Sequence, residues 1–321
     1  MMLKKISIII PIYNVESYVG KTLESVFQTT APLDSYEVIV VNDGTKDGSM
    51  NVVRRFENHP SLAIVEQENQ GLSAARMKGL SMATGEYVWF IDSDDYLVED
   101  GVGKVLNLLS EMQDVEVLMF PLRWVYEDGR DDWVDYKIDG ASIVDSKTVI
   151  VDLGLPMWAS PRFVFKRSLT VNEFLIFPYG LLHEDEYFGR VLISLAGRIG
   201  VMTDPVYMYR IRSGSITASL TIRSAYDLVS IYKSLMLYME QTMASNDWEW
   251  FRPSCFKLLQ SLYKKSFPLG NTLDFHRFAF SKGYYVWRQW LAIHPEKKLK
   301  NKLGRLFFYM FPRERGRLLG K

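Results

Sequence analysis

The stretch EYVWFIDSDDYL, residues 86–97, joins an apolar run to a cluster of carboxyl groups. The run Tyr87–Ile91 is rich in aromatic and β-branched residues and comes after Gly85, which predicts a buried strand. Residues i and i+2 of a strand face the same way, so Asp92 and Asp94 are expected to point into one space. Because unpaired buried carboxylates are costly, we expect a hard cation, Mg²⁺ or Mn²⁺, to lie between them.

The composition is that of a globular protein with no strong charge bias. The 321 residues are 48% hydrophobic and 24% charged, which allows one large domain or two smaller ones. A net charge of zero gives no indication of nucleic-acid binding. The single cysteine, Cys255, excludes an intramolecular disulfide and fits a reducing compartment. With no signal-peptide pattern and no apolar stretch near 18 residues (about one membrane span), we expect a cytoplasmic protein.

The first 110 residues alternate between strand and helix patterns. This order predicts an α/β fold with a doubly wound, mostly parallel sheet. The expected strands are residues 5–10, 37–41, 62–65 and 87–91, and the expected helices are 16–28, 47–57, 73–84 and 100–112. Ligands of such sheets bind beyond the carboxyl ends of the strands. Polar residues at 11–14, 42–44 and 92–94 therefore mark one edge as the ligand site.

The second half of the chain is less regular and ends in helices. We expect a β-ribbon in which residues 117–126 and 133–138 flank a turn at 127–130. A helix is expected at 184–196, followed by one edge strand at 201–209 around Pro205. Helical patterns at 225–243, 248–267 and 274–291 then lead into a basic tail, with a domain boundary near residue 220.

Six motifs, in order, resemble those of the family 2 glycosyltransferases with the GT-A fold. They cover roughly residues 4–220 and comprise Ile8–Asn14, Val40–Ser49, Asn69–Arg76, Asp92–Asp94, His183–Glu186 and Tyr209–Thr217. One departure is Met77-Lys78, where the family usually has Asn after the Arg. The resemblance implies a GT-A catalytic domain at 1–220 with a nucleotide-binding half (1–110) and an acceptor half (111–220). Residues 221–321 are then a helical C-terminal extension.

The resemblance also implies an activity. It is the inverting transfer of a sugar from a nucleotide-diphosphate sugar, with UDP the preferred carrier, to a hydroxyl of a saccharide or lipid-linked saccharide. The family context is bacterial surface polysaccharide biosynthesis. Asp94 is implied as a ligand of Mn²⁺ or Mg²⁺, and Asp92 as a contact of the ribose or the metal. Asp185 is implied as the general base, oriented by Glu184, although acids at a helix start also stabilise the helix dipole.

The remaining candidate residues carry an alternative beside the functional interpretation. Asp43 either accepts from a uracil imide or closes a turn with Gly44, and Glu16 either contacts the nucleotide or is an acid in the first turn of a helix. Arg76 either reaches the nucleotide or pairs with Asp92. The implied donor contacts are Pro11, Tyr13, Glu16, Asp43, Gln70, Arg76, Asp92, Ser93, Arg210, Arg212 and Ser215.

Further alternatives concern Asp95 and the acceptor side. Asp95 is expected to cap a helix or to form a salt bridge. Arg210 and Arg212 alternate with Ile211 and so face one side, either over the diphosphate or in a solvated loop. Trp158 is expected either to stack on an acceptor sugar or to lie in the core, and His183 either to contact the acceptor or to pack beside it.

The basic tail and two other functional classes complete the expectations. Residues 297–311, with Arg313, Arg315 and Arg317, favour contact with an anionic membrane surface on the inner face of the plasma membrane; a solvated helix is the alternative. A phosphohydrolase of the haloacid-dehalogenase type usually follows Asp-x-Asp with a Gly-Thr turn, but Asp95-Tyr96-Leu97 follows here. A sugar-nucleotide-binding protein without turnover is the third class, against which Asp94 and Asp185 argue.

Overall fold

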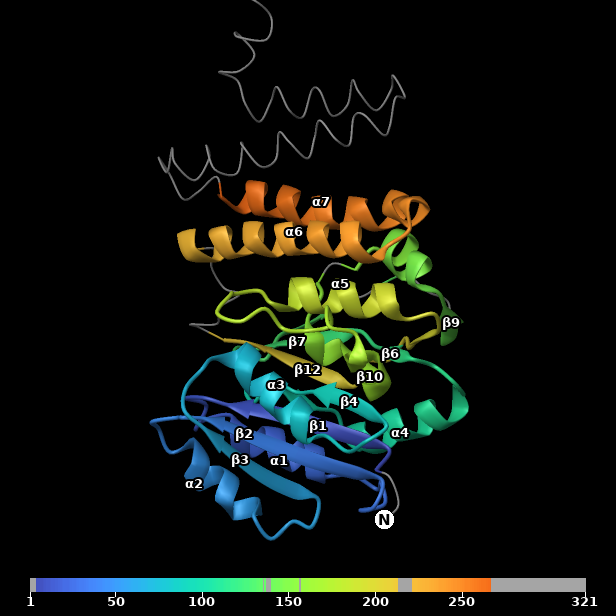
Figure 1. Cartoon of the computed structure of the whole chain (residues 1–321). Helices are drawn as coiled ribbons and strands as arrows, with labels where there is room; N and C mark the ends of the chain where they lie inside the picture. Colours follow the sequence, from blue (N-terminus) through green and yellow to red (C-terminus); the bar gives the residue numbers. More distant parts are fainter. Residues whose placement is uncertain (1–3, 135, 137–139, 156, 213–220, 267–321) are drawn as a thin grey trace, which may run out of the picture. The chain divides into compact units, whose positions relative to one another are not determined.

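Figure 1 shows the computed structural model, which describes residues 4–134, 136, 140–155, 157–212 and 221–266. The chain divides into two compact units, Met1–Phe267 and Pro268–Lys321. The second unit lies outside the described residues, as do Ser215, the expected helix at 274–291 and the basic tail. None of the helices within the described ranges is long and apolar enough to span a bilayer.

The larger sheet has eight strands in the order β3-β2-β1-β4-β10-β6-β11-β9. Its first half is parallel throughout: β1 (Ile6–Ile12) pairs with β2 (Tyr36–Asp43) and β4 (Tyr87–Phe90), and β2 pairs with β3 (Leu62–Gln67). This half confirms the predicted doubly wound arrangement. Its second half is mixed, because β10 runs antiparallel to β4 and β6 and β9 runs antiparallel to β11, whereas β6 and β11 are parallel. These strands are β6 (Val117–Met119), β9 (Ser142–Val144), β10 (Phe163–Lys166) and β11 (Ile199–Val201).

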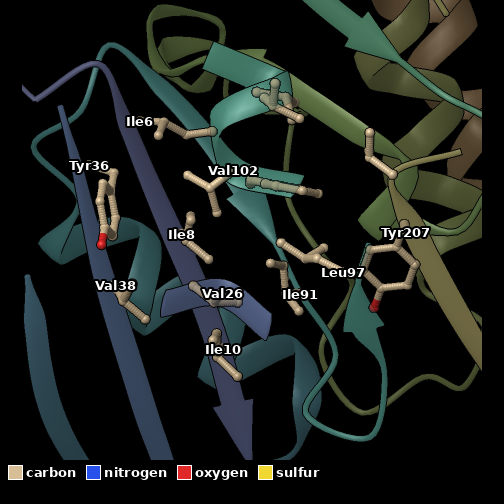
Figure 2. Close-up of a cluster of buried hydrophobic side chains, with 14 of the residues drawn as sticks. Ile6, Ile8, Ile10, Val26, Tyr36, Val38, Ile91, Leu97, Val102 and Tyr207 are labelled. Carbon is tan, nitrogen blue, oxygen red and sulfur yellow. The ribbon is translucent and has the colours of Figure 1, made fainter. Parts of the chain in front are cut away.

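Helices cover both faces of the parallel half because β1 is apolar on both sides. Ile6, Ile8 and Ile10 belong to a core cluster with residues of α1 (Val19–Phe27) and α4 (Gly101–Glu111) (Figure 2). Ile9 faces α3 (Leu72–Met82) instead: a Cβ added to Gly79 of that helix would lie 2.3 Å from Ile9 Cγ2. The close approach of α3 to the sheet therefore requires a glycine at that position.

A second sheet has four strands in the order β5-β12-β7-β8 and corrects two of our expectations. The first arm of the predicted ribbon is divided at Pro121, so that β6 joins the large sheet and β7 (Leu122–Tyr126) joins the small one, where it pairs with β8 (Asp131–Val134). The strand predicted at 201–209 is likewise two strands, β11 and β12 (Tyr207–Ile211), in different sheets. Pro121 and Pro205 lack the N–H that a continuous ladder needs. β12 lies between β7 and β5 (Tyr96–Leu97), so it is not an edge strand.

Short helical turns and three longer helices complete the described chain. A capping box between Thr221 and Ser224 starts α6, because each side chain accepts from the backbone N–H of the other residue. Helices α6 and α7 lie side by side in Figure 1, and α5 contacts α6. The remaining elements are α2 (Ser49–Val53), η1 (Arg54–Phe56), η2 (Thr148–Leu153), η3 (Ser160–Arg162), η4 (Arg167–Val171), α5 (Asp185–Leu195), α6 (Ile222–Thr242), η5 (Ser245–Asp247) and α7 (Trp248–Ser266).

Candidate active site

The turn after β4 carries three carboxyl groups, and each has a different partner. Asp95 N donates to Asp92 O at 3.1 Å, which closes the turn. Asp92 Oδ1 accepts from Arg76 Nη2 at 2.7 Å. Asp94 Oδ2 accepts from Arg212, with Nε at 2.9 Å and Nη2 at 2.8 Å. Burial, followed by the charge of Asp92, raises the pKa of Asp94, and Arg212 opposes that shift.

Asp95 is a structural connection between the two sheets and does not cap a helix. Its side chain is 2% exposed, and it accepts from Tyr207 Oη and Arg210 N, both at 2.7 Å. Tyr207 Oη also accepts from Asp92 N at 3.1 Å, so strand β12 holds the turn directly. Burial and the neighbouring carboxylates raise the pKa of Asp95 well above its usual value. The expected helix cap is wrong because α4 begins six residues after Asp95, with Asp100 at its N-cap.

Tyr207 is a site residue that the sequence did not indicate. The only available signal was Asp95, a third carboxyl group directly after Asp-x-Asp. Because it lies on no helix, it needed a buried hydrogen-bond donor such as Tyr207.

Arg76 on α3 connects the turn after β4 to the start of α5. Its Nη1 donates to Glu184 Oε1 at 2.7 Å and to Asp185 Oδ1 at 3.0 Å, while Nη2 binds Asp92. The arginine is 1% exposed and its Cζ lies 4.9 Å from the centre of the Phe177 ring. The pairing with Asp92 that the sequence allowed is present. Glu184 and Asp185, at the start of α5, also bind Arg76.

Asp185 combines partial exposure with a pKa suited to proton transfer. Its side chain is 22% exposed, compared with 9% for Glu184. Burial raises the pKa of Asp185 to about 7; the charge of Arg76 opposes the rise, and Glu184 and Asp92 add to it. An acid whose pKa lies near the working pH is an effective general base.

Asp43 anchors the loop that follows β3. Its carboxylate is 2% exposed and accepts from Gln67 Nε2 (2.7 Å), Asn69 Nδ2 (3.2 Å), Gln70 N (2.8 Å) and Gly71 N (2.9 Å). Gly71 has a φ of 87°, a left-handed conformation that favours glycine at this position. Contact of Asp43 with a nucleotide base would require this loop to open or one donor to leave.

The other candidate donor contacts lie around the same edge with differing exposure. Glu16 Oε2 accepts from Gly48 N at 2.9 Å, and α1 starts at Val19, so Glu16 is not the helix acid that the alternative describes. Tyr13 is 47% exposed, and Gln70 is also exposed. Pro11 is buried in β1, and Ser93 is buried with its carbonyl oxygen accepting from Thr22 Oγ1 at 2.8 Å.

Arg210, on β12, and Arg212, directly after it, face the same side, as their alternation predicts. The Cζ atoms of both lie 5.0 Å from the centre of the Tyr18 ring. Arg210 Nε donates to Asp94 O at 2.8 Å, while Arg212 binds the carboxylate of Asp94. The aromatic support from Tyr18 is a second feature that the sequence did not indicate.

The two acceptor-side candidates occupy different surroundings. Trp158 is 4% exposed and packs against Arg190, whose Cζ lies 4.7 Å from the ring centre. It is a core residue, so stacking on a sugar would require the ring to become exposed. His183 is half-buried, has a left-handed backbone (φ 64°) and directly precedes Glu184.

The turn Asp92–Asp95, which we call the acidic turn, fits a cation site whose coordination shell is completed by oxygen atoms of a bound ligand. No group of three or more His, Cys, Asp or Glu side chains in the described ranges could hold a metal ion. Hydrogen bonds within those ranges engage Oδ1 of Asp92 and Oδ2 of Asp94, which leaves the second oxygen of each carboxyl group. Mg²⁺ is commonly held by one or two carboxylates together with substrate phosphates. The donor set therefore suits a divalent cation bound together with a diphosphate.

A largely parallel sheet with an Asp-x-Asp turn at its carboxyl edge is typical of the GT-A class of nucleotide-sugar transferases. Residues 7–153 match the model of Glycosyl transferase family 2. The glycosyltransferase GlyA of Streptococcus pneumoniae is 32% identical over 238 residues, which cover 70% of this chain and 33% of GlyA. The chain thus spans about a third of that relative's length.

Two solved structures share the fold. TarS of Staphylococcus aureus, residues 1–349 in complex with UDP-GlcNAc, matches with a TM-score of 0.61 at 20% identity and covers 81% of each chain. The mannosyltransferase PcManGT of Pyrobaculum calidifontis, in complex with GDP-Man and Mn²⁺, matches with a TM-score of 0.54 at 19% identity, covering 100% of this chain and 89% of that one. The chain belongs to glycosyl transferase family 2, and its fold is the GT-A fold.

Proposed function

We propose that the protein is a divalent-cation-dependent, inverting glycosyltransferase. It moves a sugar from a UDP-sugar to a hydroxyl of a saccharide or lipid-linked saccharide in the synthesis of a surface polysaccharide. The observation that carries this proposal is the position of Asp185, which shares Arg76 Nη1 with Glu184 while Arg76 Nη2 holds Asp92 of the acidic turn. One guanidinium group therefore joins the candidate base to the candidate donor site.

Asp185 acts as the general base in this reaction. It takes the proton of the acceptor hydroxyl as the hydroxyl oxygen forms a bond to the anomeric carbon, and the bond from that carbon to the diphosphate breaks with its electron pair. This single displacement inverts the anomeric configuration, so an α-linked donor yields a β-linked product. Proton removal by a positioned base contributes about 10²–10⁴-fold to the rate.

Asp94, with Asp92, would hold the cation. A bound Mn²⁺ or Mg²⁺ supplies electrostatic stabilisation of the negative charge that develops on the leaving diphosphate. Arg210 and Arg212 lie beside Asp94 and can pair with phosphate oxygens, which guanidinium groups bind well. When every carboxyl group is ionised, Asp92, Asp94, Glu184 and Asp185 exceed the two arginines paired with them, Arg76 and Arg212, by two charges. A divalent cation offsets that excess.

Two further observations favour uracil as the base of the donor and a polysaccharide as the product. The Asp43 motif and the UDP-GlcNAc in the TarS structure favour UDP, whereas PcManGT carries GDP-Man. TarS bears the name poly(ribitol-phosphate) β-N-acetylglucosaminyltransferase and is 27% identical over 208 residues, which cover 64% of this chain and 35% of TarS. These names favour an acceptor on the cell surface.

The test is UDP release from a panel of UDP-sugars with Mn²⁺ and candidate acceptors, with the product linkage determined by NMR. We expect one donor to be used and Asp185→Asn to lower kcat by about 10²–10⁴-fold. Glu186→Gln is a matched control, because Glu186 is the next acid of α5 and pairs with Arg190 instead of Arg76. No UDP release with any donor, or equal rates for wild type and Asp185→Asn, would contradict the proposal. UDP binding by calorimetry without turnover would favour a binding protein.

A further inference from the structure

The side chain of Arg76 is hydrogen-bonded both to the acidic turn and to the start of α5. Its Nη2 binds Asp92, and its Nη1 binds Glu184 and Asp185. Nη1 and Nη2 of a guanidinium group lie in one rigid plane. The positions of the three carboxylates relative to one another are therefore set by a single planar group.

The surroundings of Arg76 fix this group in place and keep it from the solvent. The arginine is 1% exposed and rests on Phe177, which stacks on Phe188 of α5 with ring centres 4.0 Å apart. Ser73 Oγ, one turn earlier on α3, donates to Pro178 O at 2.9 Å, which holds α3 against the segment that leads to Glu184. The contacts of Arg76 are therefore with other protein groups, and almost none of its surface is exposed.

Resting on the proposed function, we propose that Arg76 is a positioning residue that aligns the base Asp185 with the donor-binding carboxylate Asp92. The sequence left open a nucleotide contact or a pairing with Asp92, and this proposal rests on the pairing that the structure contains. Positioning matters because a misplacement of about 1 Å in an active site can cost about 10²-fold in rate.

The same contacts make Arg76 the main positive charge that faces Asp185. The charged groups around Asp185 are Arg76 from α3, Asp92 from the turn after β4, and Glu184, its neighbour in the chain. Arg76 favours the ionised form of Asp185, whereas burial and the two other acids favour the protonated form. Loss of the charge at position 76 should therefore raise the pKa of Asp185.

Two substitutions separate geometry from charge. Arg76→Lys keeps a positive charge, but a single ammonium group cannot donate along both arms of the fork. We expect it to lower kcat by about 10²-fold, with the KM for the donor changing far less. Arg76→Gln removes the charge, and we expect the pKa of Asp185 to rise by about 1 to 3 units.

The pKa is measured by ¹³C NMR of protein labelled at the aspartate Cγ, with the Asp185 resonance assigned by its loss in Asp185→Asn. This measurement needs no turnover, so it tests the electrostatic coupling of Arg76 to Asp185 even where no donor is found and the proposed function fails. Arg252→Lys is the control, since Arg252 is a buried arginine (4% exposed) on α7. It should lower Tm without moving the titration of Asp185.

Two results would overturn the inference. One is an unchanged Asp185 titration in folded Arg76→Gln. The other is a kcat for Arg76→Lys within a few-fold of wild type, which decides the matter if Arg76→Gln does not fold. A loss of Tm in both variants with neither kinetic nor titration effects would show that Arg76 is structural only.

Discussion

The loop around Asp43 and the cluster around Arg76 both place carboxylates at the carboxyl edge of one parallel sheet, but they balance the charge in opposite ways. Asp43 accepts hydrogen bonds from four neutral donors, two of them backbone N–H groups of the loop it shapes. In the cluster, three carboxylates share the guanidinium group of Arg76.

This difference indicates that an incoming ligand can change the cluster around Arg76 more than it can change the Asp43 loop. The Asp43 loop is satisfied by its own donors, so its geometry is complete without a ligand. The cluster contains three acids and one arginine, and burial raises the pKa of Asp185. Burial also raises the pKa of Asp94, which lies two residues after Asp92 of the cluster. We therefore propose that cation binding and proton transfer take place at the cluster and that the Asp43 loop keeps its geometry.

The largest effect is expected from Asp94→Asn. It keeps the shape of the side chain but removes the charge that a cation needs. Because even outer partners of metal ligands contribute about 10–100-fold to affinity, loss of a ligand should weaken Mn²⁺ binding in the presence of UDP by at least about 100-fold. Electron paramagnetic resonance of free Mn²⁺ measures this. Asp34→Asn, at an exposed carboxyl group, is the control. Equal Mn²⁺ affinity in wild type and Asp94→Asn would place the cation elsewhere.

Asp43→Asn tests the other side of the comparison. One carboxylate oxygen becomes an amide NH₂ group that faces the N–H of Gln70 or Gly71, so a hydrogen bond to a charged acceptor is lost and two donors meet. We expect the free energy of unfolding to fall by about 1–3 kcal/mol, measured by urea denaturation, while Mn²⁺ affinity stays near that of wild type. A loss of Mn²⁺ affinity as large as that of Asp94→Asn would show that the two regions are not separate.

The pH dependence should report Asp185 in the cluster. If Asp185 is the base, as we propose, it acts in its ionised form, and burial raises its pKa to about 7, so kcat/KM should fall about tenfold for each pH unit below that value. We expect the residual activity of Asp185→Asn to lack this fall of kcat/KM at low pH. A profile that is flat from pH 5 to 7 (about two decades of expected change) would mean that another group accepts the proton.

The same pKa has an opposite consequence for stability. The folded protein holds the proton of Asp185 more tightly than the unfolded chain does, because burial raises the folded pKa above the usual value. Between the ordinary aspartate range and about 7, this group's contribution to the free energy of unfolding therefore falls as the pH rises. Activity should increase over the interval in which this contribution to stability is lost. In Asp185→Asn the latter trend should be weaker.

The fold was predictable where strands and helices alternate with clear punctuation. The parallel half, β1 to β4 with its helices, appears where the apolar runs and Gly85 place it. The second half of the fold was not predictable, because prolines divide apolar runs that look continuous in the sequence. Pro121 and Pro205 each divide an apparent strand into two parts that belong to different sheets. Only the long-range pairing of β12 with β7 reveals this division.

The site was predictable as a set of residues but not as a set of partners. The motifs indicated Asp92, Asp94, Glu184, Asp185 and Arg76. In the structure Arg76 pairs with Asp92, Glu184 and Asp185, whereas Asp94 pairs with Arg212. Tyr207 and Phe177 were missed, since a buried hydroxyl that supports Asp95 and a ring beneath a guanidinium depend on contacts distant in sequence. Burial also distinguishes Trp158 from an exposed sugar platform, which no local pattern can do.

The smallest predicted effect concerns Arg212, which binds the carboxylate that the cation needs. Its Nε and Nη2 lie 2.9 and 2.8 Å from Asp94 Oδ2, so a cation must compete with this pair or use the other oxygen. Both side chains are about a quarter exposed, and such pairs contribute about 1 kcal/mol or less. Arg212→Gln should therefore strengthen the binding of Mn²⁺ alone by no more than about 5-fold, while weakening the binding of UDP with Mn²⁺. Calorimetric titration with Mn²⁺, with and without UDP, measures both changes, and Arg130→Gln is the exposed control. Weaker binding of Mn²⁺ alone in Arg212→Gln would show that the arginine supports the cation site instead of competing for it.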